Sequence, residues 1–533
     1  MIKRYTQIFF ILLIFIIPAR SFSQTFTEDI YKFSRAMGYI SNFYVDTING
    51  PKLIENAIVN LLKELDPHSV YIPKDEVKEM NEPLEGNFEG IGIQFNILHD
   101  TIYVISPISG GPSEKVGIRA GDRIISINDE IVAGKGISNT GVRDRLLGEK
   151  GTIVIVSIKR KGVSELLQFT ITRDKIPIYS VDAAYLIDKE IAYIKISRFA
   201  STTVDEFVEK AKKLKNDGAK SLILDLRDNG GGYLDKAIEL ADHFLDDKKL
   251  IVYTEGMRVP RKENLATIDG IYQDGNVIVL IDEGSASASE IVAGAIQDWD
   301  RGIIIGRRSF GKGLVQQQLF LPDGSLIRLT VARYHTPTGR VIQKPYDQGL
   351  EEYEKELLTR YQQGELLNKD SINFPDSLKY YTLQNKRIVY GGGGIMPDIF
   401  VPLDTTSVTE FYSKMVRTGV LNSFVLDYID KNRKSLKSKY PNFNTYLQKF
   451  EVTSEMIDNL VTFGAKSKIE PKENDIEKSK PDFSLIIKAL IARDLWDMSE
   501  YFQIVNVRDK GFNKAVEVVK NWEKYNSEVL ISK

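Results

Sequence analysis

The sequence predicts a multidomain α+β protein in which a small β domain and an α/β layered core lie between helical regions. Three observations carry this prediction. The chain has 533 residues, and a single hydrophobic core stops growing beyond roughly 250–300. Residues 86–173 are short β runs separated by glycines, whereas residues 176–340 alternate strands with helices. The stretches on either side have the apolar spacing of amphipathic helices.

Residues 1–23 have the pattern of a secretory signal peptide. Lys3 and Arg4 precede an apolar run at 8–17, and small residues then favour cleavage before Gln24. The alternative is a retained membrane anchor, but the apolar run has about ten residues and a span needs roughly 20. The rest of the chain has no second long apolar run, so we expect a mature protein that is soluble or peripherally membrane-associated.

The composition excludes several kinds of site. There is no cysteine, which rules out disulfides, thiolate nucleophiles and Cys-ligated zinc. No two histidines have the i, i+4 spacing of a zinc protease helix, and we expect neither a metal nor an organic cofactor. The formal net charge of −2 argues against nucleic-acid partners, which require a basic face. The four histidines are His68, His99, His243 and His335.

A helical region is predicted at 24–84, because apolar residues recur at helical spacing at 30–40 and at 54–65. A β domain is predicted at 85–175, with a short helix at 138–147. Its strands are expected at 91–95, 102–105, 123–128 and 153–156.

The glycine loop near the start of this β domain is a candidate peptide-binding site. A glycine loop beside an open strand edge can hold a C-terminal carboxylate and extend the sheet with a peptide. An ordinary small β domain explains the same pattern. The loop residues are Gly90, Ile91, Gly92 and Ile93.

The α/β core is predicted at 176–345, where alternating strands and helices argue for a layered βαβ arrangement. A strand at 399–401, within 387–405, completes it. The core strands are expected at 191–196, 221–226, 277–281 and 302–305, and the helices at 204–214, 233–244 and 289–299.

Two further segments surround the end of the core. Residues 346–386 form a polar, partly helical insertion. Residues 406–533 have helical spacing, interrupted at 466–482 by a charge-rich stretch that predicts an exposed linker. The apolar stripes of the terminal helices suit dimer contacts, although core packing is their commoner fate.

Two loops of the core carry candidate catalytic side chains. Ser285, Ser287 and Ser289 lie in a turn of small residues between a strand and a helix, where free N–H groups can hold an anion. Lys312 lies between two glycines after the next strand, and a partly buried lysine can be the base that a serine nucleophile needs. From the residues alone, the serines could equally be helix caps, and the lysine a phosphate contact or part of a solvated loop.

Three successive glycines, Gly230, Gly231 and Gly232, follow another strand of the core. Their N–H groups can form a concavity that binds anions, which in an acyl-transfer enzyme would be an oxyanion hole. The alternatives are a dinucleotide site or a plain tight turn, although the G-x-G-x-x-G spacing is absent.

Together these stretches resemble the carboxyl-terminal processing proteases, the S41 serine peptidases, over roughly residues 66–401. The resemblance implies a PDZ-like domain at 85–175 and a ClpP/crotonase-like layered protease core. The insertion and the region from Thr409 onward lie outside the match. The matching stretches are 65–69, the PDZ-like segment, 225–232, 285–290, 309–316 and 394–398.

The resemblance also implies roles for single residues. Ser287 would be the nucleophile, Lys312 the general base, and Gln316 the residue that orients the lysine amine. The glycine loop of the PDZ-like domain would bind the C-terminus of a substrate. The oxyanion hole would consist of backbone N–H groups of Gly231, Ala288 and, as a near alternative, Gly230.

The sequence therefore predicts an exported serine endopeptidase of the C-terminal processing type, acting through an acyl-enzyme in the periplasm or cell envelope. Its expected partners are proteins with accessible C-terminal tails, and an adaptor protein or a second copy of the chain are further candidates. Other interpretations are a catalytically silent scaffold and an acyl-CoA thioester enzyme on a related core. A histidine base, at His335 or His243, is a weaker alternative to Lys312.

Overall fold

The computed structural model describes residues 21–98, 100–108, 110–246, 248–267, 269–406 and 409–531. Most of the predicted signal peptide and His99 lie outside these residues. The chain divides into two compact units, one ending at Tyr71 and the other beginning at Ile72. Every helix in the described ranges is too short or too polar to cross a membrane.

The first unit contains two helices, α2 (Ser21–Phe43) and α3 (Gly50–Lys63), as the apolar spacing predicts. Asp66 then forms a turn in which its carboxylate accepts hydrogen bonds from the backbone N–H groups of His68 and Ser69. The short strand β1 (Val70–Ile72) follows. Apolar side chains that the two helices expose to solvent include Ile30, Phe33, Phe43, Ile54 and Leu61.

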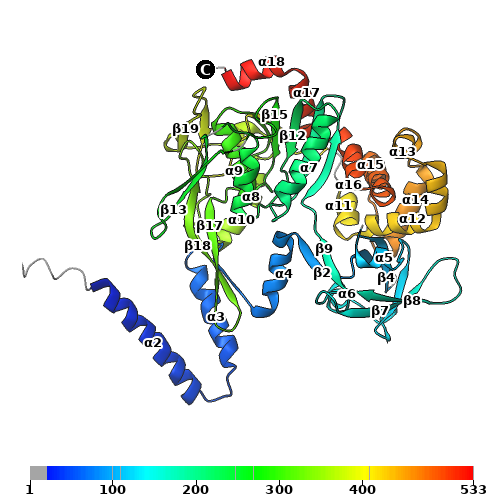
Figure 1. Cartoon of the computed structure of the whole chain (residues 1–533), viewed down its shortest axis with the longest axis horizontal. Helices are drawn as coiled ribbons and strands as arrows, with labels where there is room; N and C mark the ends of the chain where they lie inside the picture. The colour runs from blue at the N-terminus through cyan, green and yellow to red at the C-terminus, as the bar shows by residue number, and fades with distance from the viewer. Residues whose placement is uncertain are drawn as a thin grey trace, which may run out of the picture. The chain divides into compact units, whose positions relative to one another are not determined.

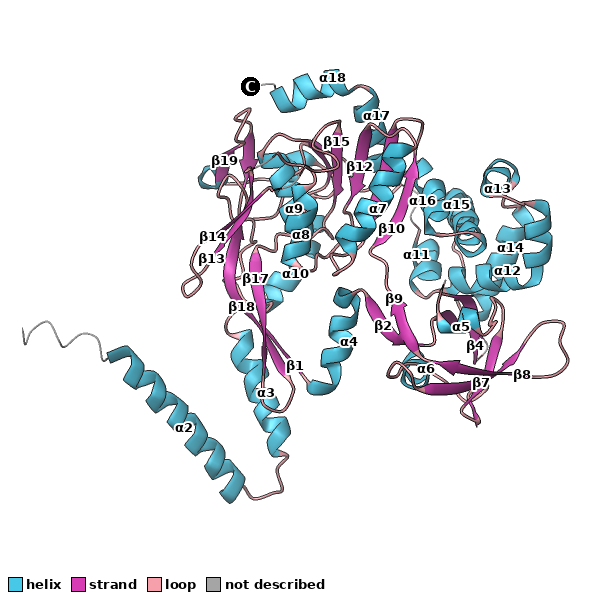
Figure 2. Cartoon of the chain, in the orientation of Figure 1, coloured by secondary structure: helices cyan, strands magenta, loops and turns pink. Residues whose placement is uncertain are grey.

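The second unit begins with helix α4 (Lys74–Glu85) and continues into the β domain. An antiparallel sheet has the order β3-β4-β5-β7-β8, with β6 paired to β5. Figure 2 shows strands of this sheet in magenta, and their alternating apolar side chains form one core. β2 (Asn87–Gly90) and β9 (Asp174–Pro177) pair where the chain enters and leaves the domain. The other elements are β3 (Ile93–Leu98), β4 (Thr101–Pro107), α5 (Pro112–Lys115), β5 (Arg123–Ile127), β6 (Glu130–Ile131), α6 (Asn139–Leu146), β7 (Ile153–Lys159) and β8 (Leu167–Thr172).

The α/β core is built on a sheet in the order β10-β11-β12-β15-β16-β21, which is parallel except for β10. Its central strands are almost continuous apolar runs, because helices cover both faces. Helices α7, α8 and α9 cover one face (Figure 1), and α17 (Lys510–Lys520) covers the other. The strands are β10 (Val181–Leu186), β11 (Ile191–Ile196), β12 (Ser221–Asp225), β15 (Val277–Ile281), β16 (Ile303–Gly306) and β21 (Ile399–Phe400). The helices are α7 (Thr203–Asn216), α8 (Leu234–Asp242) and α9 (Ala288–Asp298).

A second, antiparallel sheet of the core contains β17, β18, β13 and β14. β13, which is largely apolar, and the more polar β14 were not predicted from the sequence. The insertion forms helix α10, two 3₁₀ turns and a hairpin. The bounds are β13 (Leu250–Glu255), β14 (Lys262–Leu265), β17 (Leu314–Phe320), β18 (Leu326–His335), α10 (Leu350–Gln362), η1 (Lys369–Ser371), η2 (Asp376–Leu378), β19 (Lys379–Tyr381) and β20 (Ile388–Tyr390).

The helices after β21 fall into two groups. Those from α11 to α16 share a core of their own, whereas α17 packs on the core sheet. The predicted linker at 466–482 is wrong in its second part, because α15 begins at Asp475 and its Ser479 is buried against Thr409. The bounds are α11 (Glu410–Arg417), α12 (Val420–Lys439), α13 (Phe443–Lys449), α14 (Ser454–Lys466), α15 (Asp475–Leu495), α16 (Met498–Val505), η3 (Asn506–Arg508), α18 (Trp522–Tyr525) and η4 (Asn526–Ile531).

Candidate active site

Three loops meet at one edge of the core sheet, because the carboxyl ends of parallel strands share an edge. We call them the glycine loop (226–233, after β12), the serine turn (282–287, after β15) and the lysine loop (307–313, after β16). The Ala286 N–H donates to the carbonyl of the glycine-loop residue Asn229 (2.9 Å). In the lysine loop, the Phe310 N–H donates to the Ser285 carbonyl (2.9 Å).

Ser287 ends the serine turn in a strained backbone conformation. Its φ of 54° and ψ of −111° lie outside the regions that residues with a side chain favour, at a cost of roughly 1–3 kcal/mol. The residue directly precedes α9 and is half-buried. A strained turn between a strand and a helix presents the nucleophile of α/β hydrolases at the sheet edge, and the same local geometry occurs here.

The two neighbouring serines have structural contacts. The Ser285 hydroxyl donates to the Leu226 carbonyl (2.8 Å) and accepts from the Asp282 N–H (2.9 Å). The Ser289 hydroxyl donates to the Asn229 carbonyl (2.9 Å). Both side chains are fully buried. Of the three serines, Ser287 is therefore the one that a substrate can reach.

Lys312 and Ser287 lie on adjacent backbone segments. The Lys312 amine donates to the side-chain oxygen of Gln316 on β17 (3.0 Å), and both residues are half-buried. The hydroxyl of Tyr334, on β18, lies 2.6 Å from the Lys312 carbonyl oxygen and 3.2 Å from the Ser287 carbonyl oxygen. One side chain thus touches the backbone of both candidate catalytic residues.

Two buried carboxylates hold these loops. Asp282 accepts from the Asp228 N–H (2.9 Å), and burial together with the charge of Asp228 raises the pKa of Asp282 to about 6. Glu290, in the first turn of α9, accepts from the Ser287 N–H (2.8 Å), and burial raises the pKa of Glu290 to about 7 although its hydrogen bonds act against this. The Ser-x-x-Glu spacing of a capping box could have indicated this contact, whereas no local pattern indicates Tyr334.

The predicted oxyanion donors lie beside Ser287. A Cβ placed on Gly231 would lie 2.8 Å from the Ser287 Cβ and 3.0 Å from the Ala288 nitrogen. The Gly231 N–H itself donates to the Asn229 side-chain oxygen (2.9 Å), so it could serve a substrate only after leaving that partner. Within the described ranges, the N–H groups of Gly230 and Ala288 donate in no hydrogen bond.

The insertion supports the lysine loop. The guanidinium of Arg360, on α10, donates to the carbonyls of Arg308 (2.8 Å) and Ser309 (3.2 Å). Tyr353 of the same helix packs edge-on against Phe310, with 6.1 Å between ring centroids. The segment that lies outside the family resemblance therefore contacts the loop that carries Lys312.

An ion-pair cluster lies beside the glycine loop. The guanidinium of Arg227 contacts the buried carboxylate of Asp225 (2.6 Å) and that of Asp509, the N-cap of α17 (2.8 Å). Burial raises the pKa of Asp225, but the charges of Arg227 and Lys195 together with the hydrogen bonds to the carboxylate outweigh burial and hold this pKa far below its usual value.

The histidines have other partners. His335 stacks on Tyr253, with 4.4 Å between ring centroids, and its Nδ1 lies 3.1 Å from the Gly339 carbonyl oxygen. His243 is buried, which lowers its pKa, and its Nδ1 has no partner among the described residues. No group of three potential metal-ligating side chains occurs in the part of the chain that the structure describes.

The predicted peptide-binding loop lines an apolar groove of about 390 Å³ in the β domain. Ile91, Gly92 and Ile93 line it, while Gly90 pairs with Asp174 at the end of β2. The other lining residues include Phe88, Phe95, Val142, Leu146 and, at the rim, Arg143, which pairs with Glu79 of α4 (2.7 Å).

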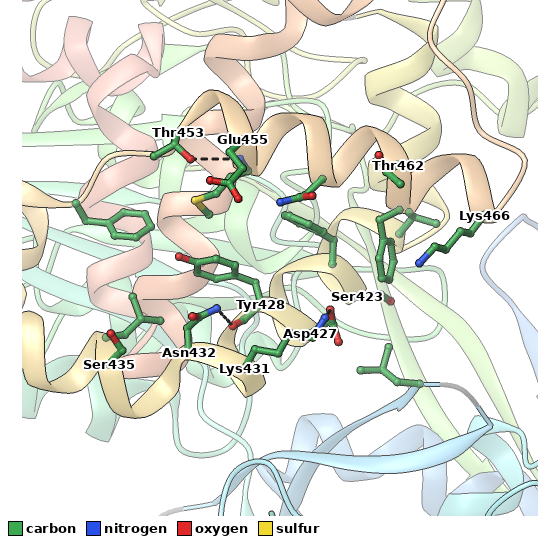
Figure 3. A pocket seen from close by; sticks show the side chains of 18 of the residues that line it. Ser423, Asp427, Tyr428, Lys431, Asn432, Ser435, Thr453, Glu455, Thr462 and Lys466 are labelled. Carbon is green, nitrogen blue, oxygen red and sulfur yellow. Dashed lines mark hydrogen bonds and ion pairs between the residues drawn. The ribbon is translucent and has the colours of Figure 1, made fainter.

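A larger cavity, of about 1110 Å³, lies in the helical part and contains none of the candidate catalytic residues (Figure 3). Side chains of α12 and α14 line it. They carry both signs of charge, with Asp427 and Glu455 against Lys431 and Lys466, so its electrostatics favour no ligand class.

Comparisons with known proteins identify the chain as a serine peptidase. A model of peptidase family S41 matches residues 190–351, a PDZ domain model matches residues 90–172, and a family of unknown function matches residues 411–497. The resemblance and fold class predicted from the sequence are thereby confirmed.

Curated relatives identify the family more closely. The carboxy-terminal-processing protease of Bartonella bacilliformis is 38% identical over 341 residues, which cover 62% of this chain and 76% of the relative. The carboxy-terminal processing protease CtpA of Bacillus subtilis is 30% identical over 467 residues, covering 84% and 98%. A solved photosystem II D1 C-terminal processing protease is 31% identical, covers 58% of this chain and 82% of its own, and has a TM-score of 0.34. This chain belongs to the carboxy-terminal processing proteases.

Proposed function

We propose that this chain is an exported serine endopeptidase that cuts peptide bonds with Ser287 as nucleophile and Lys312 as general base. The observation that carries the proposal is the adjacency of the two backbones, whose carbonyl oxygens both contact the Tyr334 hydroxyl. Gln316 orients the lysine amine through the 3.0 Å contact between their side chains.

The chemistry is an acyl transfer in two steps. Ser287 Oγ attacks the peptide carbonyl carbon while the neutral Lys312 amine takes the hydroxyl proton and passes it to the leaving nitrogen. Water then attacks the carbonyl carbon of the resulting ester while Lys312 takes its proton; as the ester bond breaks, Lys312 passes this proton to the Ser287 oxygen, and the acid product leaves. The developing oxyanion is bound by the N–H groups of Ala288 and Gly230, with Gly231 contributing if it releases Asn229.

The β domain selects the substrate in this proposal. The apolar groove beside Ile91, Gly92 and Ile93 suits a C-terminal tail added at the edge of β3. We therefore propose that the substrates are proteins with accessible, apolar C-terminal tails in the periplasm or cell envelope. An adaptor protein or a second copy of the chain are the other proposed partners.

The test is cleavage of an unfolded protein with an apolar C-terminus. Ser287→Ala and Lys312→Ala should each abolish cleavage, whereas the exposed controls Ser435→Ala and Lys355→Ala should cleave like the parent. A fully active Ser287→Ala variant would remove the proposal. A tail that binds without being cut by the parent would favour the scaffold interpretation.

A further inference from the structure

One buried carboxylate joins the serine turn to the lysine loop. Glu290 Oε2 accepts hydrogen bonds from the Ser287 N–H (2.8 Å) and the Lys312 N–H (2.9 Å). Glu290 Oε1 accepts from the Gly311 N–H (2.7 Å) and the Ser309 hydroxyl (2.5 Å). All four partners donate to Glu290, and the Ser309 oxygen also accepts from the Ile395 N–H (2.6 Å). A carboxylate provides acceptor sites for all four.

The buried Tyr334 hydroxyl makes the second connection, through carbonyl groups. It has one proton, which points mainly to the Lys312 carbonyl oxygen at 2.6 Å and more weakly to the Ser287 carbonyl oxygen at 3.2 Å. Burial and the nearby charge of Glu290 raise the pKa of Tyr334 well above its usual value, so the hydroxyl stays a donor. Ser287 and Lys312 are therefore each held at both their N–H and their C=O groups.

This double attachment bears on catalysis because of the backbone of Ser287. Its conformation, at φ 54°, persists only where the surroundings over-determine it. The serine side chain has a single rotatable bond before its oxygen, so the backbone largely sets where that oxygen lies. A displacement of about 1 Å in a reacting group can cost roughly 100-fold in rate.

We propose that Glu290 and Tyr334 are positioning residues that fix the backbones of Ser287 and Lys312 relative to each other. Neither touches the substrate. This inference rests on the proposed roles of Ser287 and Lys312, and it adds two side chains to the machinery of the same reaction.

Conservative substitutions separate this role from simple packing. Glu290→Gln keeps the size of the side chain, but its amide NH₂ must face at least one backbone N–H in either orientation, that of Gly311 or those of Ser287 and Lys312. Tyr334→Phe removes a single oxygen and leaves the ring. Matched controls are Asp494→Asn, a buried carboxylate of α15 that pairs with Arg433, and Tyr272→Phe, a buried tyrosine whose hydroxyl has no partner among the described residues.

The experiment measures kcat and KM for a tail-bearing peptide, and the rate at which a fluorophosphonate probe labels the serine. Glu290→Gln should lower kcat and the labelling rate by about 100-fold, and Tyr334→Phe by about tenfold, with KM within about twofold of the parent. Both control variants should keep the kcat and labelling rate of the parent. A purely structural role would instead lower thermal stability and leave the kcat of the folded fraction unchanged.

The outcomes separate this inference from the proposed function. If Ser287→Ala is inactive while Glu290→Gln and Tyr334→Phe keep the parent kcat, the positioning role is wrong and the nucleophile stands. If Ser287→Ala remains active, the nucleophile assignment fails and the positioning role fails with it. If Glu290→Gln does not fold, as judged by near-UV circular dichroism, the kcat of Tyr334→Phe alone tests the positioning role.

Discussion

Replacing Asp298 with alanine should destabilise the core, because it leaves a buried guanidinium without its counter-ion. The Asp298 carboxylate lies 2.7 Å from the guanidinium of Arg340, and both side chains are fully buried. It also accepts hydrogen bonds from the N–H (3.0 Å) and the hydroxyl (2.8 Å) of Thr338. The pair thus ties the end of α9 to the segment that follows β18.

The expected loss is about 3–4 kcal/mol. Removing one partner of a buried ion pair costs roughly 3–5 kcal/mol, since the remaining charge is uncompensated. The lower part of that range applies because Arg340 keeps two neutral partners, the side-chain oxygen of Gln297 (2.8 Å) and the Tyr390 carbonyl (2.8 Å). The double variant Asp298→Leu with Arg340→Met replaces both ions by apolar residues. It should lose only about 1–2 kcal/mol relative to the parent, less than Asp298→Ala alone, because it leaves no uncompensated buried charge.

The assay is a guanidinium titration followed by fluorescence. The chain has three tryptophans, and Trp299 directly follows Asp298. With Trp496 and Trp522 changed to phenylalanine, the signal reports on Trp299 alone. A loss below about 1 kcal/mol for Asp298→Ala, or a double variant as unstable as the sum of the two single variants, would contradict the reasoning.

Two further predictions concern the loops of the site. Since the pKa of Glu290 lies near 7 in the folded chain and near 4.5 when unfolded, the folded state binds this proton more tightly. Its contribution to the free energy of unfolding should therefore fall by about 3 kcal/mol as the pH rises from about 4.5 to about 7. Denaturant titrations at several pH values should show that the difference in stability between the parent and Glu290→Gln changes by this amount over that range. If the stabilities of the two proteins follow parallel curves with pH, the reasoning is refuted. Arg360→Ala should lower kcat about tenfold because two lysine-loop carbonyls lose their donor; Lys355→Ala on the same helix is the control, and equal kcat values would show that α10 does not support the loop.

Local patterns were sufficient for the elements that carry the candidate site. The strands at 191–196 and 277–281 are uninterrupted apolar runs, and the structure has them at the same residues. The helix predicted at 289–299 is α9, one residue earlier. In each case both faces are buried, so composition alone reveals the element.

Long-range contacts could not be predicted in this way. The polar start of α15 resembled a linker because most of its side chains face solvent, and burial of Ser479 depends on a partner 70 residues away in sequence. The contact of Arg360 with the lysine loop is likewise set by tertiary packing. Tyr334 gave no signal because a tyrosine on a strand is usually a packing residue, and only the fold places its hydroxyl beside the Ser287 carbonyl.

The position of α17 in the chain gives the enzyme an order of assembly. Residues 510–520 are synthesised after every strand of the sheet they cover, so one face of that sheet stays exposed until they emerge. The same helix supplies Asp509, the partner of Arg227 at the entrance to the glycine loop. A nascent chain would therefore contain Ser287 and Lys312 long before the glycine loop gains its contact with Asp509.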